Sequence, residues 1–218
     1  MQLPDFIERF LHYLKHHGFG ATMRRIGLSL QRVGTGNRFV LYSCDLGSFR
    51  PETTDDLNGG KVERKDVPGE LSPQEMAEIG SNWKTTRDKR RLRERFEQGA
   101  SLWLFKVEGK IAGYGWTMIG HTVERHYFPL GANDAHLFDF FVFPEFRGRR
   151  INPLLVNCIL KQLALENKPR AFIEAAVWNR PQLSSLGRTP FKPIGKAWKC
   201  CVFGRVLVVW SRTDMIRA

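Results

Sequence analysis

One segment constrains the fold more than any other part of the chain. Residues 136–155 read HLFDFFVFPEFRGRRINPLL. The apolar run from Leu137 to Phe143 predicts a buried strand, Pro144 opens a turn that ends at Arg150, and a helical apolar pattern follows. Such a junction directs backbone N–H groups and the positive end of a helix dipole to one spot, which favours phosphate. Without a ligand, the same residues would form a plain strand–turn–helix connection.

The residues at the end of the turn affect how a ligand would fit. Asn152 is a good N-cap and Pro153 is the favoured first helical residue, so the pair predicts a helix start. Arg150 is bulky where a close approach to phosphate favours glycine. Its side chain would either fold outward to a phosphate or partly block the site.

The remaining patterns predict strands and helices around this segment. A capping box at Ser72–Glu75 opens one helix, and Glu108-Gly109-Lys110 separates two strands of a hairpin. Residues 47–69 are polar and are expected to form a mobile, turn-rich segment. Further strands are predicted at 38–46, 101–107, 111–119, 171–178, 198–203 and 206–210, and further helices at 88–98, 153–166 and from 180 onward.

The turn and the element order resemble the GCN5-related N-acetyltransferase (GNAT) superfamily, whose loop usually reads V-x-P-x-[YF]-R-G-x-G-I-G-x-x-L-L. The residues that match it are Val142, Pro144, Phe146, Arg147, Gly148, Ile151 and Leu155, while Arg150 and Asn152 stand where the family has glycine. The resemblance implies an α+β fold with a mixed twisted sheet of about seven strands and flanking helices. It assigns residues 37–218 to an acyltransferase domain and leaves 1–36 as an N-terminal helical extension.

The resemblance also implies a co-substrate, acetyl-CoA or another acyl-CoA, and no metal. The residues expected to bind it are Phe141, Val142, Phe143, Arg147, Gly148, Arg149, Arg150, Ile151, Asn152 and Asn179. Asn179 and Phe191 keep the separation of an Asn–Phe pair common in the family, although Asn179 would equally serve as a plain helix cap. Leu186 stands where many relatives have a Tyr that protonates the departing thiolate, which leaves Ser185 as a nearby hydroxyl.

An amine acceptor must lose a proton before it attacks, so a base is expected. Residues 137–142 read LFDFFV and resemble the L-E-D-F-F-V of diamine acetyltransferases, which makes Asp139 the first candidate. The neighbouring phenylalanines are expected to raise its pKa by desolvation. Glu174 and His136 are weaker candidates, and Asp139 on an exposed strand face is the alternative.

Charge and cysteine content indicate which kinds of partner and which cellular compartment to expect. Residues 147–218 hold 14 Lys and Arg against three acids, whereas residues 1–146 hold 20 against 19. This basic field suits an anionic co-substrate or an acidic partner such as acyl carrier protein, but the arginines lack the interleaved aromatic residues of a nucleic-acid platform. The four cysteines show no disulfide or metal-ligand spacing, so we expect a cytoplasmic protein.

The sequence therefore predicts an N-acyltransferase that moves an acetyl group directly from the thioester to a primary amine of a small molecule or peptide. The alternative is a catalytically degenerate domain that binds acyl-CoA or another protein. Residues 1–33 predict two amphipathic helices, which either pack on the domain or a second copy or attach weakly to a membrane surface.

Overall fold

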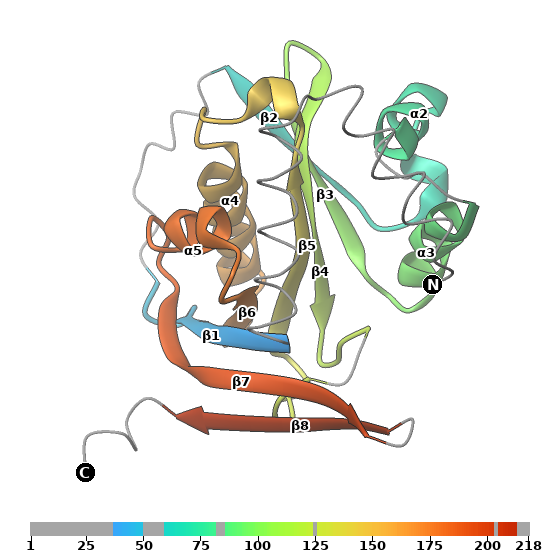
Figure 1. Ribbon diagram of the computed structural model, residues 1–218. Helices are drawn as coiled ribbons and strands as arrows, with labels where there is room; N and C mark the ends of the chain where they lie inside the picture. Colours follow the sequence, from blue (N-terminus) through green and yellow to red (C-terminus); the bar gives the residue numbers. More distant parts are fainter. Residues whose placement is uncertain (1–36, 50–58, 82–85, 124–125, 203–204, 213–218) are drawn as a thin grey trace, which may run out of the picture.

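The structure is a computed structural model that describes residues 37–49, 59–81, 86–123, 126–202 and 205–212. Within them, eight strands form one twisted sheet in the order β2-β3-β4-β5-β6-β1-β7-β8 (Figure 1). The strands are β1 (Asn37–Asp45), β2 (Gly60–Lys65), β3 (Ser101–Val107), β4 (Lys110–Ile119), β5 (Ala135–Val142), β6 (Arg170–Ala176), β7 (Lys192–Val202) and β8 (Arg205–Arg212). All neighbouring pairs are antiparallel except β5 and β6, which are parallel.

Helices cover both faces of this sheet. Helices α4 (Ile151–Leu165) and α5 (Arg180–Leu186) lie on one side, and α2 (Pro73–Ser81) and α3 (Thr86–Glu97) lie on the other (Figure 1). Two short 3₁₀ turns, η1 (Pro68–Glu70) and η2 (Pro144–Phe146), precede α2 and α4. The mixed sheet with flanking helices confirms the predicted fold class.

Two local predictions are confirmed in atomic detail. At the start of α2, the Ser72 N–H donates to Glu75 Oε2 at 2.6 Å and the Glu75 N–H donates to Ser72 Oγ at 3.1 Å, which is a complete capping box. Between β3 and β4, Glu108 and Gly109 have φ of 50° and 79°, as a two-residue hairpin turn requires.

One strand was missed. Residues 47–69 were expected to be a mobile, turn-rich segment, but β2 lies within them and pairs with β3 along its whole length. Its sequence, GKVERK, has a single apolar residue, Val62, because β2 is an edge strand with little burial. Such a strand gives almost no period-2 signal. The two helices predicted for residues 1–33 lie outside the described residues.

The sheet opens at its centre. β5 and β6 are paired only from Ala135–Ala171 to Leu137–Ile173, and the two strands separate beyond that point. The edge of β5 that faces β6 is therefore left without a partner strand over its last residues. In a parallel sheet, such a separation exposes backbone N–H and C=O groups that a ligand can bind.

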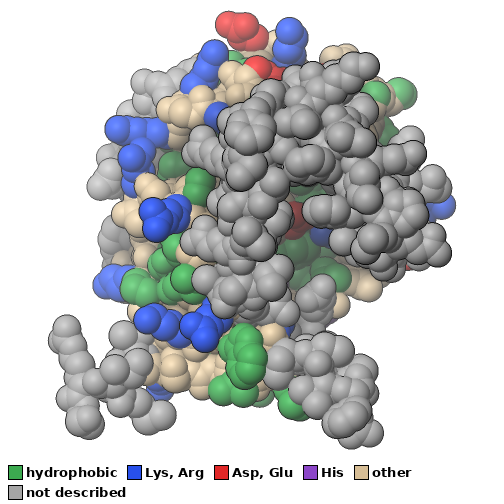
Figure 2. Space-filling model, viewed as in Figure 1, with side chains coloured by type: hydrophobic (Ala, Val, Ile, Leu, Met, Phe, Trp, Pro, Cys, Tyr) green, Lys and Arg blue, Asp and Glu red, His purple; other side chains and the backbone are tan. Residues whose placement is uncertain are grey.

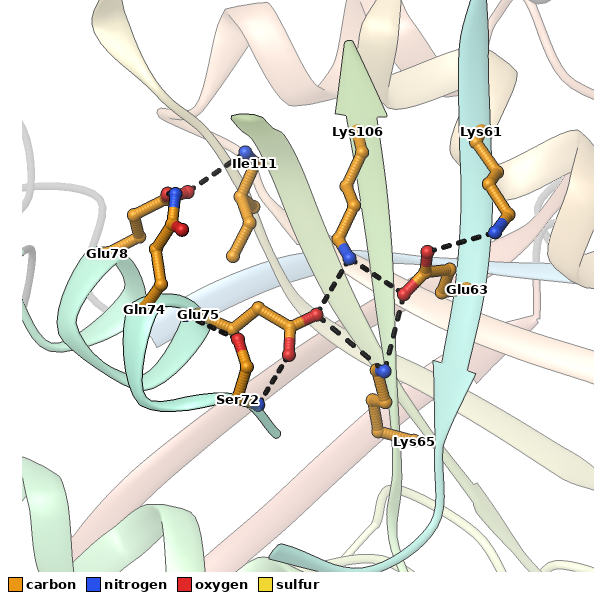
Figure 3. A network of polar contacts seen from close by, with 9 residues as sticks. All are labelled: Lys61, Glu63, Lys65, Ser72, Gln74, Glu75, Glu78, Lys106 and Ile111. Carbon is orange, nitrogen blue, oxygen red and sulfur yellow. Dashed lines mark hydrogen bonds and ion pairs between the residues drawn. The ribbon is translucent and has the colours of Figure 1, made fainter. Parts of the chain in front are cut away.

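A charged network joins α2 to the strands β2 and β3 at one edge of the sheet (Figure 3). Lys106 Nζ lies 2.7 Å from Glu63 Oε2 and 2.8 Å from Glu75 Oε1, so one ammonium joins β2, β3 and α2. The hydrogen bond from Lys106 lowers the pKa of Glu63 to about 2. Burial alone would raise the pKa of Glu75, but its hydrogen bonds to Lys106 and Ser72 lower it. Both carboxylates are therefore charged at neutral pH.

Candidate active site

A pocket of about 520 Å³ lies where β5 leaves β6, between the start of α4 and helix α5. Its walls come from the end of β5, from the turn that follows it and from α5. The lining residues include Phe141, Val142, Arg147, Gly148, Arg150, Ile151, Asn152, Asn179, Ser184 and Ser185. The structure thus brings most of the residues predicted to bind acyl-CoA to one cavity. Phe143 is instead buried in the core, and Arg149 stacks on Phe146 beside the pocket, with its Cζ 5.5 Å from the ring centroid.

The turn before α4 has the geometry of an anion-binding loop. Gly148 has φ of 82°, and no atom lies within 4 Å of the place where a Cβ would stand. Arg150 also has a left-handed conformation, with φ of 58°, and is the N-cap of α4. The N–H groups of Ile151 and Asn152, the first two residues of the helix, have no partner within it, and both residues line the pocket. The left-handed conformation of Arg150 accounts for the glycine that the family loop has at this position, since the left-handed region costs residues other than glycine about 1–2 kcal/mol.

The predicted helix start was wrong by two residues. Asn152 was expected to be the N-cap with Pro153 as the first helical residue, but α4 begins at Ile151 and Asn152 lies inside its first turn. The Asn152 side chain is thereby free for another role. Its Nδ2 donates to Ser185 Oγ at 3.0 Å, and its buried Oδ1 has no hydrogen-bond partner among the described residues. An unsatisfied buried acceptor that lines a pocket indicates a missing donor.

Residues in and next to helix α5 have different environments. Asn179 caps it, accepting from the Gln182 N–H at 3.4 Å and donating from Nδ2 to Gln182 Oε1 at 2.9 Å. Leu186 is 1 % exposed and packs in the core, whereas Ser185 faces the pocket. Position 186 therefore lies away from the pocket in this chain. The hydroxyl groups that α5 brings to the pocket are those of Ser184 and Ser185.

β5 contains a bulge at Asp139, beside the pocket. Trp116 pairs with Phe138 and Tyr114 pairs with Phe141, so β5 has one more residue than β4 between these pairs. Asp139 has φ of 50°, a conformation that Asp tolerates better than most residues. On β4, Gly115 makes room for the distorted strand, because a Cβ there would lie 2.4 Å from the Phe140 ring.

The structure favours the alternative given for Asp139, an exposed carboxylate. The phenylalanines do not desolvate it, because the side chain is 47 % exposed and accepts a hydrogen bond from Arg95 Nη1 at 2.6 Å. Arg95 is 17 % exposed and stacks over Trp116 and Phe138, at 5.1 Å and 5.4 Å from their ring centroids. The bulge accounts for the exposure of Asp139, because it turns this residue out of the aromatic layer.

Comparison with known families now decides the assignment. The sequence model described as "Acetyltransferase (GNAT) family" matches residues 70–184, more than half of the 218-residue chain. The chain belongs to the GNAT acetyltransferase family. The match spans the helices α2 and α3, the bulged strand, the loop at Gly148 and most of α5.

Solved GNAT structures share the fold at low sequence identity. A tandem GNAT protein from the clavulanic acid biosynthesis pathway is 16 % identical with a TM-score of 0.51, over 72 % of this chain and 50 % of its own. A GNAT acetyltransferase from Colwellia psychrerythraea is 12 % identical with a TM-score of 0.51, over 72 % and 53 %. This chain thus spans about half of each of these two proteins. No curated protein gives a significant match.

A second polar group lies on the sheet face opposite α4. His136, on β5, is 5 % exposed and its Nε2 lies 2.8 Å from Oε2 of Glu174 on β6. His126, from the connection between β4 and β5, lies against His136 with 5.1 Å between the ring centroids. Glu174 and His136 were predicted only as separate candidates, and His126 was not singled out. No spacing rule relates residues so far apart in the chain, so only the fold shows that they meet.

The surface around the pocket is basic. Arg147, Arg149, Arg150, Arg180 and Arg188 are all exposed. Figure 2 shows Lys and Arg side chains over the side of the molecule that carries α4 and α5. No helix of the described residues is long and apolar enough to span a bilayer.

Proposed function

We propose that this GNAT family member is an acyl-CoA-dependent N-acyltransferase that transfers an acyl group, most simply acetyl, to a primary amine. The observation that carries the proposal is the pocket between β5, the Gly148 loop and α5, with the unsatisfied Asn152 Oδ1 in its wall. Both a diphosphate and an amide-containing arm find partners there, and acyl-CoA contains both.

The residues of the pocket fit acyl-CoA part by part. The N–H groups of the loop and of the first turn of α4, together with Arg147 and Arg150, suit the diphosphate. The unpaired edge of β5 beyond Leu137 suits the pantetheine amides, because these can extend the sheet as a strand would. Asn152 lines the pocket, and its buried Oδ1 would accept a hydrogen bond from one pantetheine N–H once the side chain turns toward the ligand.

The proposed reaction is a direct transfer. The amine nitrogen attacks the thioester carbonyl carbon, the carbonyl oxygen becomes negatively charged, and the C–S bond then breaks to release the thiolate. The proton that the nitrogen loses passes to water, which in turn protonates the released sulfur. A backbone N–H left out of the ladder by the bulge at Asp139 is a suitable donor to that oxygen. Ser185 accepts from Asn152, so its own hydroxyl hydrogen is available to the departing sulfur.

A covalent intermediate on a cysteine has no support among the cysteines whose side chains the structure describes. Cys44 is buried, and this burial raises its pKa to about 11, which disfavours the thiolate. Cys158 lies on α4 and does not line the pocket.

For Asp139, the geometry supports a structural contribution to the site. It maintains a left-handed bulge and is held by Arg95. Its use as the base that accepts the amine proton is the alternative, and the variants Asp139→Gly and Asp139→Val separate the two roles.

The test is an amine panel with thiol release as the readout. Amino sugars, polyamines, amino acids and peptides with free N-termini would each be supplied with acetyl-CoA and with longer acyl-CoAs. We expect thiol release that depends on one amine class and yields an equal amount of N-acylated product by mass spectrometry. Saturable acyl-CoA binding with no release for any amine would refute the transferase assignment.

That second outcome would support a non-catalytic acyl-CoA-binding domain. Three observations favour it as the second candidate: Arg150 in place of a loop glycine, Leu186 in the core in place of the family Tyr, and the ion-paired Asp139. Such a domain would bind acyl-CoA and free CoA in the same pocket without turnover.

A further inference from the structure

Three side chains from separate parts of the chain meet on the sheet face opposite α4. His126, His136 and Glu174 each direct one potential ligand atom into a group whose members all lie within 4.8 Å of one another. His136 and Glu174 come from the paired region of β5 and β6, where the backbone is fixed by the ladder, and His126 comes from the β4–β5 connection. Two imidazoles and one carboxylate are a ligand set that zinc accepts.

The hydrogen bonding of this group is incomplete. His136 is 5 % exposed, yet its Nδ1 is buried with no hydrogen-bond partner among the described residues. The same holds for Nε2 of His126. Buried polar atoms are nearly always satisfied, so the orphaned Nε2 of His126 in this group points to a binding partner, while His136 already directs its Nε2 toward Glu174.

We propose that His126, His136 and Glu174 bind a divalent transition metal ion, with Zn²⁺ as the reference ion, through three protein ligands and one open position. Atoms bound to one tetrahedral zinc ion lie roughly 3.3–3.6 Å apart, as follows from bond lengths of about 2.0–2.2 Å. The group must therefore contract by about 1 Å from its present widest separation. His126 can provide this movement, since it lies on a connection and not on a strand.

The group is reachable and has one opposing charge. His126 also lines a separate pocket of about 440 Å³, bordered by Gly120, His121, Tyr127, Phe128 and Val208, which offers a route for an ion. Lys199, on β7, is a cation close enough to act electrostatically on both His126 and Glu174, and its Nζ lies 4.7 Å from the centroid of the Tyr127 ring. A dication must compete with this ammonium, so we expect Lys199→Met to tighten metal binding.

Two of these residues have an alternative function. His136 and Glu174 could act as a hydrogen-bonded pair that handles a proton without any metal. The two uses differ in a measurable way, because a proton-handling pair gives no saturable affinity for Zn²⁺ and imposes no tetrahedral spectrum on Co²⁺.

The experiment measures metal binding directly and does not depend on acyltransferase activity. Residues 1–36 contain His12, His16 and His17, so the parent protein for the titration is the full chain with these three changed to Ala. Zn²⁺ affinity is obtained by competition with a chromophoric chelator, and Co²⁺ is followed by its visible absorption. We expect one equivalent of Zn²⁺ and the intense visible bands of a tetrahedral Co²⁺ site.

Ligand variants decide the assignment. His126→Ala and Glu174→Gln should each weaken Zn²⁺ binding by at least about 100-fold, since changing a residue that only orients a metal ligand already costs about 10–100-fold. The control is His121→Ala, an exposed histidine of the same connection whose ring nitrogens contact the Ile119 and Gln98 carbonyl oxygens. A thermal melt establishes that each variant is folded. Equal affinity in His126→Ala and the parent, or no saturable binding by the parent, would overturn the proposal.

Discussion

Arg95 on α3 and Asp139 on β5 form an ion pair of 2.6 Å between Nη1 and Oδ2, at the point where β5 bulges beside the acyl-CoA pocket. The guanidinium is largely enclosed by Trp116 and Phe138, while the carboxylate is half exposed. The pair therefore links the helical layer of the domain to the backbone that is proposed to polarise the thioester.

This pair yields a variant series that separates the two roles of Asp139. Asp139→Gly removes the carboxylate but keeps the left-handed bulge, whereas Asp139→Val disfavours that bulge. If the bulge is what matters, kcat should stay within about 5-fold in the Gly variant and fall by at least about 100-fold in the Val variant, the range seen when an oxyanion donor is lost. Steady-state kinetics with the identified amine provide the measurement. A loss of about 100-fold or more in the Gly variant would identify Asp139 as the base.

Asn152 should contribute to acyl-CoA affinity through its orphaned Oδ1. Asn152→Ala is expected to raise the Kd for acetyl-CoA about 10-fold, because one hydrogen bond to the ligand is worth roughly 1–1.5 kcal/mol. Asn157→Ala is a matched control, since Asn157 lies on the same helix with a buried, unpartnered Oδ1 but outside the pocket. Calorimetry checks both. An unchanged Kd in Asn152→Ala would remove this residue from the binding site.

Lys106 should stabilise the fold through the network in Figure 3. Lys106→Met leaves Glu63 and Glu75 without their shared ammonium, and we expect a loss of about 1.5–3 kcal/mol in the free energy of unfolding. Lys61→Met is the control, because Lys61 also pairs with Glu63 but is 76 % exposed, so its loss should cost less than about 1 kcal/mol. Urea unfolding measures both values. Equal losses would show that Lys106 stabilises the fold no more than the exposed Lys61 does.

The same network predicts how stability depends on pH. The pKa of Glu63 is lowered from 4.5 to about 2 in the folded state, so this group stabilises the fold fully above about pH 4.5. That contribution should disappear progressively as the pH falls toward 2, because the folded state then gains the proton that the unfolded chain already holds. In Lys106→Met, the stability should change less between about pH 5 and pH 3 than in the wild type. A slope as steep as that of the wild type would place the titrating group elsewhere.

Much of the fold could be predicted from the sequence because its signals are local. The capping box at Ser72, the turn at Gly109 and the apolar runs of β3 and β4 depend on neighbouring residues only. β2 was not predicted because this edge strand has too few apolar residues to show the two-residue period of a strand. The fold class was therefore correct while one strand was missing.

The site was predictable where it depends on a contiguous motif and not where it depends on packing. The loop from Arg147 to Asn152 could be identified from its residues, although the helix starts at Ile151 because Arg150 adopts the left-handed conformation itself. Whether Asp139 is exposed or desolvated was left open by the sequence, since the bulge shows only in the register of β4 and β5. The meeting of His126, His136 and Glu174 depends on the order of strands in the sheet, which no local pattern contains.

Binding of acyl-CoA by the pocket at the Gly148 loop can be measured by calorimetry with acetyl-CoA on two matched glycine variants. Gly148 and Gly109 have φ of 82° and 79°, and neither has an atom within 4 Å of the place where a Cβ would stand, so aspartate strains both backbones similarly. Only Gly148→Asp places a carboxylate where the diphosphate is expected. We expect saturable binding by the wild type and by Gly109→Asp, and no detectable binding by folded Gly148→Asp. Wild-type affinity in Gly148→Asp, or no binding by the wild type, would mean that acyl-CoA does not bind at this loop.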